Sequence, residues 1–261
     1  MPFRERFVDA DNFRIRYMEA GEGPPLIHLH GAGGLHMTPA HDLLSRDRRV
    51  IVFEMPGFGE SAENTRSATM ADLAATMARA VRALGIDACD LLGSSFGGKV
   101  ALWLTALHPE RIRALVLEAP AAIRPAGMRP PSGTTAEMAQ LLFAHPERAE
   151  PLPEPDAATA QKQRSLVGRL RGPDRDQALE DRMRGLQTSV LVLFGTLDRV
   201  MPPELGRVYK ALLPNCHLVF VYDAGHLIGA ERPEAFAEVV GDFLDRREAF
   251  VISRRETKIY P

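Results

Sequence analysis

The chain has 261 residues, of which 45% are hydrophobic and 25% charged, so it can bury one large core in the manner of an ordinary globular protein. Its formal net charge of -2 leaves no basic field to attract nucleic acid or an anionic membrane surface. The charged N-terminus lacks the apolar region of a signal peptide, and no stretch approaches the roughly 20 apolar residues of a transmembrane helix. With two cysteines expected as reduced thiols of the core, these features predict a cytoplasmic protein.

Short apolar runs alternate along the chain with longer segments of helical period. The N-terminal runs 6–9 and 13–20 flank Asp11-Asn12, a pair that tolerates a left-handed turn, and so predict an antiparallel hairpin. Further strands are predicted at 26–29, 50–53, 90–92, 115–117, 190–194 and 217–222, and helices at 71–84, 99–107, 203–213 and 233–250. This alternation predicts an α/β fold around a mostly parallel sheet.

Residues 121–187 interrupt the alternation, because they contain many prolines and no strand-like run. Helical pieces at 135–144, 157–170 and 174–183 would cover a site better than they would extend a sheet. We therefore expect a core domain of 1–120 and 188–261 with a helical cap, or lid, of 121–187. The tail 251–261 is expected as a peripheral strand or arm with no assignable role.

The run Gly93-Ser94-Ser95-Phe96-Gly97 follows a predicted strand and precedes a predicted helix. A serine at such a sharp turn needs small flanking residues, because neighbouring backbone must pass close by while the hydroxyl projects above the sheet. Ser95 is therefore the predicted nucleophile. The alternative is a glycine-rich turn with a chance serine.

A serine hydroxyl needs a base, usually a histidine oriented by a carboxylate, and in this type of fold both follow the serine in the chain. His226 lies on a loop after the strand 217–222, where ligands meet the carboxyl end of a sheet. Asp198 follows the strand 190–194 and is the predicted acid. Asp223 is a rival acid, but it lies too close in sequence to reach the far ring nitrogen of His226 easily.

Acyl transfer also needs two N–H donors for the developing oxyanion. The backbone of Phe96 is one predicted donor, and Ala32, with Gly33 as a near second, is the other. The glycine-rich loop 30–34 could instead be a simple turn or a phosphate loop, but it lacks the spacing of a P-loop or a dinucleotide site.

These motifs occur in one order over nearly the whole chain: His30-Gly31, then 56–61 (Pro-Gly-Phe-Gly-Glu-Ser), Ser95, Asp198 and Gly225-His226. In this the chain resembles the α/β-hydrolase superfamily, in its capped branch of serine esterases and C–C hydrolases. The resemblance implies an eight-stranded, mostly parallel sheet flanked by helices, with a helical cap inserted after the sixth strand, and no metal or organic cofactor. Glu54 stands where many members carry Asp, at a position that resembles a structural loop anchor.

The function expected is that of a carboxylic ester hydrolase acting on a small or medium apolar acyl ester through an acyl-enzyme. The alternative is a C–C bond hydrolase of aromatic ring-cleavage products; such enzymes usually carry Asn before the serine and Trp after the histidine, where this chain has Ser94 and Leu227. A non-catalytic ligand receptor is a third hypothesis, disfavoured because no triad residue is missing. We expect a small-molecule substrate and a monomer or homodimer. Candidate apolar pocket residues are Leu35, Met128, Met138, Phe143 and Leu227.

Overall fold

The computed structural model describes residues 2–152 and 154–250, so the expected arm 251–261 lies outside the described residues. The described chain forms one eight-stranded sheet in the order β1-β2-β4-β3-β5-β6-β7-β8. Strand β2 runs antiparallel to both of its neighbours, β1 and β4, whereas β3 to β8 are parallel to one another. The strands are β1 (Arg4–Ala10), β2 (Phe13–Ala20), β3 (Pro25–Leu29), β4 (Arg49–Phe53), β5 (Cys89–Ser94), β6 (Ile112–Glu118), β7 (Ser189–Gly195) and β8 (Cys216–Val221). The predicted α/β architecture is confirmed.

The N-terminal hairpin turns at Asp11 and Asn12, whose φ angles of 52° and 61° place both residues in the left-handed region. Two consecutive left-handed residues give a turn whose twist matches that of the flanking strands. Short polar side chains tolerate this conformation, which is why the pair predicted the hairpin.

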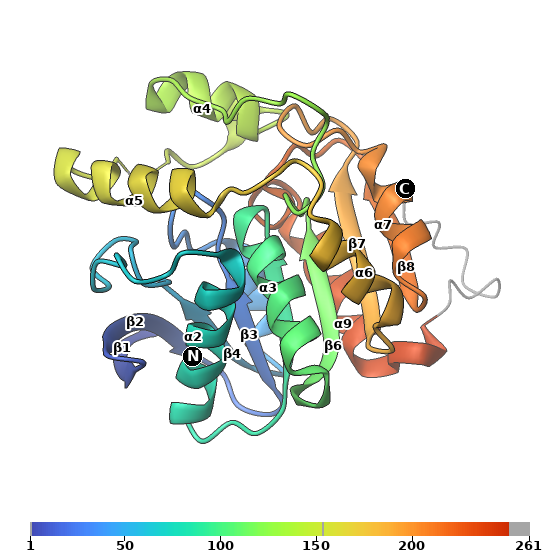
Figure 1. The fold of residues 1–261 in the computed structure, drawn as a ribbon. Helices are drawn as coiled ribbons and strands as arrows, with labels where there is room; N and C mark the ends of the chain where they lie inside the picture. Colours follow the sequence, from blue (N-terminus) through green and yellow to red (C-terminus); the bar gives the residue numbers. More distant parts are fainter. Residues whose placement is uncertain (1, 153, 251–261) are drawn as a thin grey trace.

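Helices cover both faces of the sheet (Figure 1). They are α1 (Pro39–Leu44), α2 (Met70–Ala83), α3 (Phe96–Leu107), α4 (Thr135–Leu142), α5 (Ala157–Leu170), α6 (Gln177–Gly185), α7 (Leu205–Leu212), α8 (Ile228–Glu231) and α9 (Pro233–Arg246), with 3₁₀ turns η1 (Pro109–Arg111), η2 (Pro146–Arg148) and η3 (Arg247–Ala249). Successive strand residues point to opposite faces, so Ile27 packs in a core with α2, α3, α6 and α7, whereas Leu26 packs with α1, α8 and α9. The short helices α1 and α8 were not predicted.

The segment between β6 and β7 is divided between two places. Figure 1 shows α4 and α5 standing beyond the carboxyl ends of the strands, while α6 lies beside α3. Leu179 and Met183 of α6 are buried in the core that α3 also lines. Of the helices expected in the cap, α4 and α5 therefore stand over the edge that carries the site, and α6 packs on the core.

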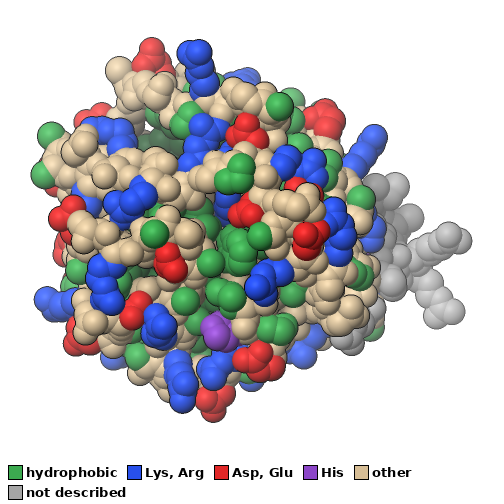
Figure 2. Space-filling model, in the orientation of Figure 1, with side chains coloured by type: hydrophobic (Ala, Val, Ile, Leu, Met, Phe, Trp, Pro, Cys, Tyr) green, Lys and Arg blue, Asp and Glu red, His purple; other side chains and the backbone are tan. Residues whose placement is uncertain are grey.

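None of the described helices is long and apolar enough to cross a membrane. On the face drawn in Figure 2, basic and acidic side chains are intermingled, in keeping with a net charge of -2. No strongly basic or acidic face is therefore visible from this side.

Candidate active site

Ser95 occupies a strained turn between β5 and α3. Its φ of 51° and ψ of -112° are unusual for a residue with a side chain. The flanking glycines make room for this turn: a Cβ on Gly97 would lie 2.0 Å from the carbonyl oxygen of Leu29, and one on Gly93 would lie 2.7 Å from Cβ of Ala101. The sequence thus builds the geometry of a nucleophile elbow.

The backbone of Ser95 is fixed on both sides. Its N–H donates to the carbonyl oxygen of Glu118 at 2.9 Å, and its own carbonyl oxygen accepts from Gly98 at 3.0 Å and Ala121 at 2.9 Å. The side chain of Ser95 is half-buried, whereas that of Ser94 is buried and bonded to its neighbours. The hydroxyl of Ser94 is thus engaged inside the protein.

His226 and Asp198, predicted as base and acid from 28 residues apart, lie in contact. Nδ1 of His226 is 2.8 Å from Oδ2 of Asp198, and both side chains are buried. The other oxygen of Asp198 accepts from the N–H groups of Val200 and Met201, each at 2.8 Å. A carboxylate held in this way accepts a hydrogen bond from Nδ1–H, which leaves the lone pair of Nε2 free to take a hydroxyl proton.

The loop predicted to form the oxyanion hole is held beside Ser95. A Cβ on Gly31 would lie 3.4 Å from Cβ of Ser95. His30 fixes the loop, because its Nδ1 lies 2.7 Å from the carbonyl oxygen of Gly31 and its Nε2 accepts from the N–H of Met55 at 3.1 Å. Burial lowers the pKa of His30 to about 4, so its ring is neutral.

The predicted oxyanion donors differ in their surroundings. Phe96 is buried at the first turn of α3, whereas Ala32 and Gly33 are exposed on the loop after β3. Both segments border Ser95, so the roles of Phe96, Ala32 and Gly33 stay a prediction that this arrangement permits.

The five candidate pocket residues do not form one wall. Leu35 packs against the core on the α1, α8 and α9 side, and Met128 against the core on the opposite face. Phe143 is fully buried, while Met138 and Leu227 are half-buried. These positions give no common lining, and a substrate contact for each remains a prediction.

Three arginines of the segment 121–187 that could have faced a substrate carboxylate form bonds elsewhere. Arg124 is buried and donates to the carbonyl oxygens of Ala121, Gly172 and Pro173 as well as to Asp174. Arg169 donates to the backbone of Asn64 and Ser67, and Arg171 to the backbone of Met128. These side chains hold loops together.

Contacts between the end of α4 and the loop of His226 were not predicted from the sequence. The carbonyl oxygen of Leu142, at the end of α4, accepts from the N–H groups of His226 at 2.8 Å and Leu227 at 3.3 Å. Glu231 joins the same segments, because one carboxylate oxygen accepts from the N–H of His145 at 3.0 Å and the other from Gly225 at 2.6 Å. A lone glutamate on a four-residue helix carries no sequence signal for this role.

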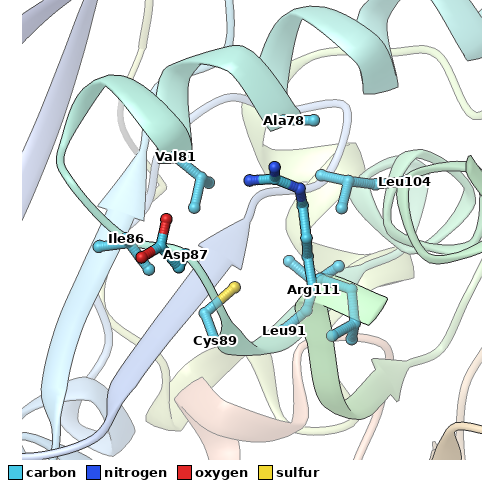
Figure 3. Close-up of a pocket in the computed structure, with 9 residues that line it drawn as sticks. Ala78, Val81, Ile86, Asp87, Cys89, Leu91, Leu104 and Arg111 are labelled. Atoms are coloured by element: carbon cyan, nitrogen blue, oxygen red, sulfur yellow. The ribbon is translucent and has the colours of Figure 1, made fainter. Parts of the chain in front are cut away.

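The cavity drawn in Figure 3 is remote from these groups. It lies between α2, the start of β5 and η1, with apolar side chains such as Val81 and Leu104 around it. Cys89 lines it, and burial raises the pKa of this thiol to about 12, so the thiol stays protonated. Since Cys89 begins β5 and Ser95 follows its other end, the cavity does not belong to the candidate site.

The chain is similar to known proteins along most of its length. A family profile described as the alpha/beta hydrolase fold matches residues 24–165. The chain is 31% identical to a 2-hydroxymuconate semialdehyde hydrolase of Pseudomonas putida over 94% of this chain and 95% of that protein. It is 27% identical to a 2-hydroxy-6-oxo-6-(2'-aminophenyl)hexa-2,4-dienoic acid hydrolase of Metapseudomonas resinovorans, over 93% and 91% of the two chains.

A similar solved structure is that of a serine hydrolase involved in carbazole degradation. It superposes with a TM-score of 0.78 at 26% identity and covers 94% of this chain and 99% of that one. The family profile, the full-length similarity and the shared fold show that the chain belongs to the α/β hydrolase fold family.

Proposed function

We propose that this protein is a serine hydrolase that cleaves a carbon–carbon bond in a 2-hydroxy-6-oxo dienoic acid, the class of compound made by ring cleavage of aromatics. The observation that carries the proposal is full-length similarity to hydrolases whose names state such substrates. The ester hydrolase expected from Ser94 and Leu227 is the weaker hypothesis, since it rested on two positions alone.

The arrangement of Ser95, His226 and Asp198 supports the chemistry. Ser95 attacks the C6 carbonyl carbon while Nε2 of His226 takes the hydroxyl proton, and Asp198 stabilises the imidazolium through Nδ1–H. Backbone N–H groups of Phe96 and Ala32, or Gly33, stabilise the oxyanion. In this scheme each residue has the role that the sequence predicts for it.

The carbon–carbon bond can break because the electron pair that it releases is stabilised by delocalisation. Once the 2-hydroxy group has tautomerised to a ketone, the C5–C6 bond is vinylogous to that ketone. The pair released from C5–C6 is delocalised to the C2 oxygen, and the dienolate takes a proton. Water then hydrolyses the acyl group from Ser95, with His226 acting again as base.

The proposal includes a core of 1–120 and 188–261 interrupted by the segment 121–187, whose helices α4 and α5 form the cap while α6 packs on the core. Support comes from the bonds of Leu142 and Glu231, which join the end of α4 to the loop of His226. Through these bonds the cap holds in place the loop that carries His226.

The test compares turnover of a 2-hydroxy-6-oxo dienoic acid with that of p-nitrophenyl esters of increasing chain length. We expect kcat/KM to be higher for the dienoic acid. Faster turnover of the esters would overturn the proposed bond specificity and restore the ester hypothesis.

The nucleophile is tested separately with a fluorophosphonate probe. Labelling is expected in the wild-type protein and in Ser165→Ala, which changes an exposed serine of α5, and is expected to be lost in Ser95→Ala. Asp198→Asn should lower kcat by about 10⁴-fold, because the amide holds the wrong imidazole tautomer. Undiminished labelling of Ser95→Ala would contradict the assignment.

A further inference from the structure

A row of polar side chains crosses the otherwise apolar layer between the sheet and helices α1, α8 and α9. His41 of α1 lies with Nε2 2.8 Å from Nδ1 of His28 on β3, and Nε2 of His28 lies 2.9 Å from Oγ of Ser94. Ser94 bonds in turn to the side chain of Glu118, at the end of β6. All four side chains are buried, and a buried polar group without a hydrogen-bond partner is costly. Their bonds to one another avoid this cost, but they do not explain why polar side chains occupy an apolar layer.

The direction of these hydrogen bonds follows from one backbone group. The N–H of Thr38 donates to Nδ1 of His41 at 2.9 Å, so Nδ1 carries a lone pair and the proton of the neutral ring is on Nε2. That proton is donated to Nδ1 of His28, whose own proton is then on Nε2 and is donated to Ser94. Ser94 accepts this hydrogen bond and donates its own hydroxyl hydrogen to Glu118.

This series of hydrogen bonds requires both histidines to be neutral, because each ring must accept at Nδ1 and donate from Nε2. Burial lowers the pKa of His41 to about 4, and burial together with His41 lowers the pKa of His28 well below its ordinary value. Every bond in the row therefore points toward Glu118. Because the other oxygen of Glu118 accepts from the N–H of Gly229 at 2.9 Å, both of its oxygens act as acceptors, as in a carboxylate.

Glu118 also touches the two segments that carry the reacting groups. Its backbone carbonyl oxygen accepts from the N–H of Ser95, and its side chain bonds Ser94, so it holds the elbow twice. Gly229, which it holds through the other carboxylate oxygen, comes three residues after His226. Burial raises the pKa of Glu118, and the bonds from Ser94 and Gly229 and the charge of His226 oppose that rise.

We infer that Glu118 is a positioning residue for the proposed serine chemistry: its buried carboxylate aligns the Ser95 elbow with the His226 loop and stabilises the imidazolium form of His226. The His28–His41 pair supplies the donors that keep Glu118 an acceptor. This inference rests on the proposed function, because the imidazolium forms when Ser95 loses its proton to His226.

The experiment measures the rate of fluorophosphonate labelling against pH, which reports the base without requiring the natural substrate. Glu118→Gln keeps the shape of the side chain and removes its charge. We expect labelling at the plateau to slow by roughly tenfold and the acidic limb to move down by about one pH unit, because a tenfold preference for the imidazolium corresponds to one unit.

The matched control is Glu180→Gln, which removes another buried carboxylate, on the distant helix α6, that is paired with Arg175. It is expected to leave both plateau and limb unchanged. A folded Glu118→Gln protein with wild-type plateau and limb would overturn the inference, and so would an equal change in the control. Absence of labelling in the wild-type protein would overturn the proposed function and this inference together.

A second variant covers the case in which Glu118→Gln does not fold. Ser94→Ala removes a donor that opposes the rise in the pKa of Glu118, so Glu118 loses its charge at a higher pH and a smaller shift of the limb in the same direction is expected. An unshifted limb in folded Ser94→Ala, beside a labelled wild type, would count against the role of the row.

Discussion

Nε2 of His145, in the segment between β6 and β7, lies 2.6 Å from Oδ1 of Asp223, which opens the loop that carries His226. The hydrogen bond from His145, aided by its charge and that of Arg148, lowers the pKa of Asp223. Glu231 ties the same two segments together through backbone N–H groups. The end of α4 and the loop of His226 are thus joined at several points.

The carboxylate bridge of Glu231 yields a first prediction. Glu231→Gln replaces one acceptor oxygen with an amide that faces a backbone N–H, so the free energy of unfolding should fall by about 1–3 kcal/mol. Hydrogen exchange of the α4 amides should become faster. The control Glu234→Gln, at an exposed position of α9, should change neither quantity, and unchanged exchange in Glu231→Gln would contradict the bridge.

The buried neutral histidines His28, His30 and His41 make stability depend on pH. The unfolded chain protonates them below pH about 6.5, whereas His30 and His41 in the folded chain do so only near pH 4 and His28 also well below 6.5. Their stabilisation is complete above pH 6.5 and is lost as the pH falls toward 4. Each contributes a slope of about 1.4 kcal/mol per pH unit.

Urea unfolding at several pH values between 7 and 5 measures this slope. His41→Gln should reduce it by about 1.4 kcal/mol per pH unit, whatever the variant does to absolute stability. A free energy of unfolding that stays flat over this range would show that the rings accept protons in the folded protein.

Lys99, buried on α3, predicts a stabilising substitution. Burial and the nearby charges of Arg124 and Arg171 lower its pKa to about 8, while Asp176 acts in the opposite direction. The unfolded chain keeps the proton that the folded chain releases, so wild-type stability should rise from pH 8 to 10.5. Lys99→Met should raise the free energy of unfolding at pH 7 by about 1–3 kcal/mol and abolish that rise.

Calorimetry at pH 7 and pH 10 checks both parts of this prediction. A lower melting temperature of Lys99→Met at pH 7 would mean that the bond from Nζ of Lys99 to the carbonyl oxygen of Arg171, at 3.0 Å, outweighs the cost of burying the charge.

Gly97→Ala tests the elbow. The new Cβ would lie 2.0 Å and 2.4 Å from the backbone oxygens of Leu29 and His30, which cannot move without displacing β3. We expect a loss of about 3 kcal/mol or more and no fluorophosphonate labelling. Gly168→Ala, in α5 with open space around it, should instead be stabilising by up to about 1 kcal/mol, and a similar effect of both substitutions on stability would contradict the close approach.

Local patterns predicted the features that depend on neighbouring residues. Asp11-Asn12 predicted the hairpin because turn preference is local, and Ser95, Asp198 and His226 were proposed as site residues because each follows a short apolar strand. In a parallel sheet such strand ends meet at one edge, which brings distant residues together without further information.

Features that depend on partners far along the chain were missed. His28 reads as one more residue of a buried strand, and its bond to Ser94 spans 66 positions. Glu118 ends a strand in the same way, and its bond to Gly229 spans 111 positions. The placement of α6 beside α3 was missed for the same reason, because its helical period does not say which element it packs against.

The carbonyl oxygen of Leu142 accepts from both His226 and Leu227. The end of α4 and the loop of the proposed base are therefore directly bonded, although Leu142 and His226 are 84 positions apart in the chain (226 minus 142). A hybrid enzyme given another family member's cap would need an acceptor at this point as well as a matching cavity. A hybrid whose cap is chosen for cavity shape alone should bind substrate and yet turn it over slowly, because the loop that carries the histidine would lack this hydrogen-bond acceptor.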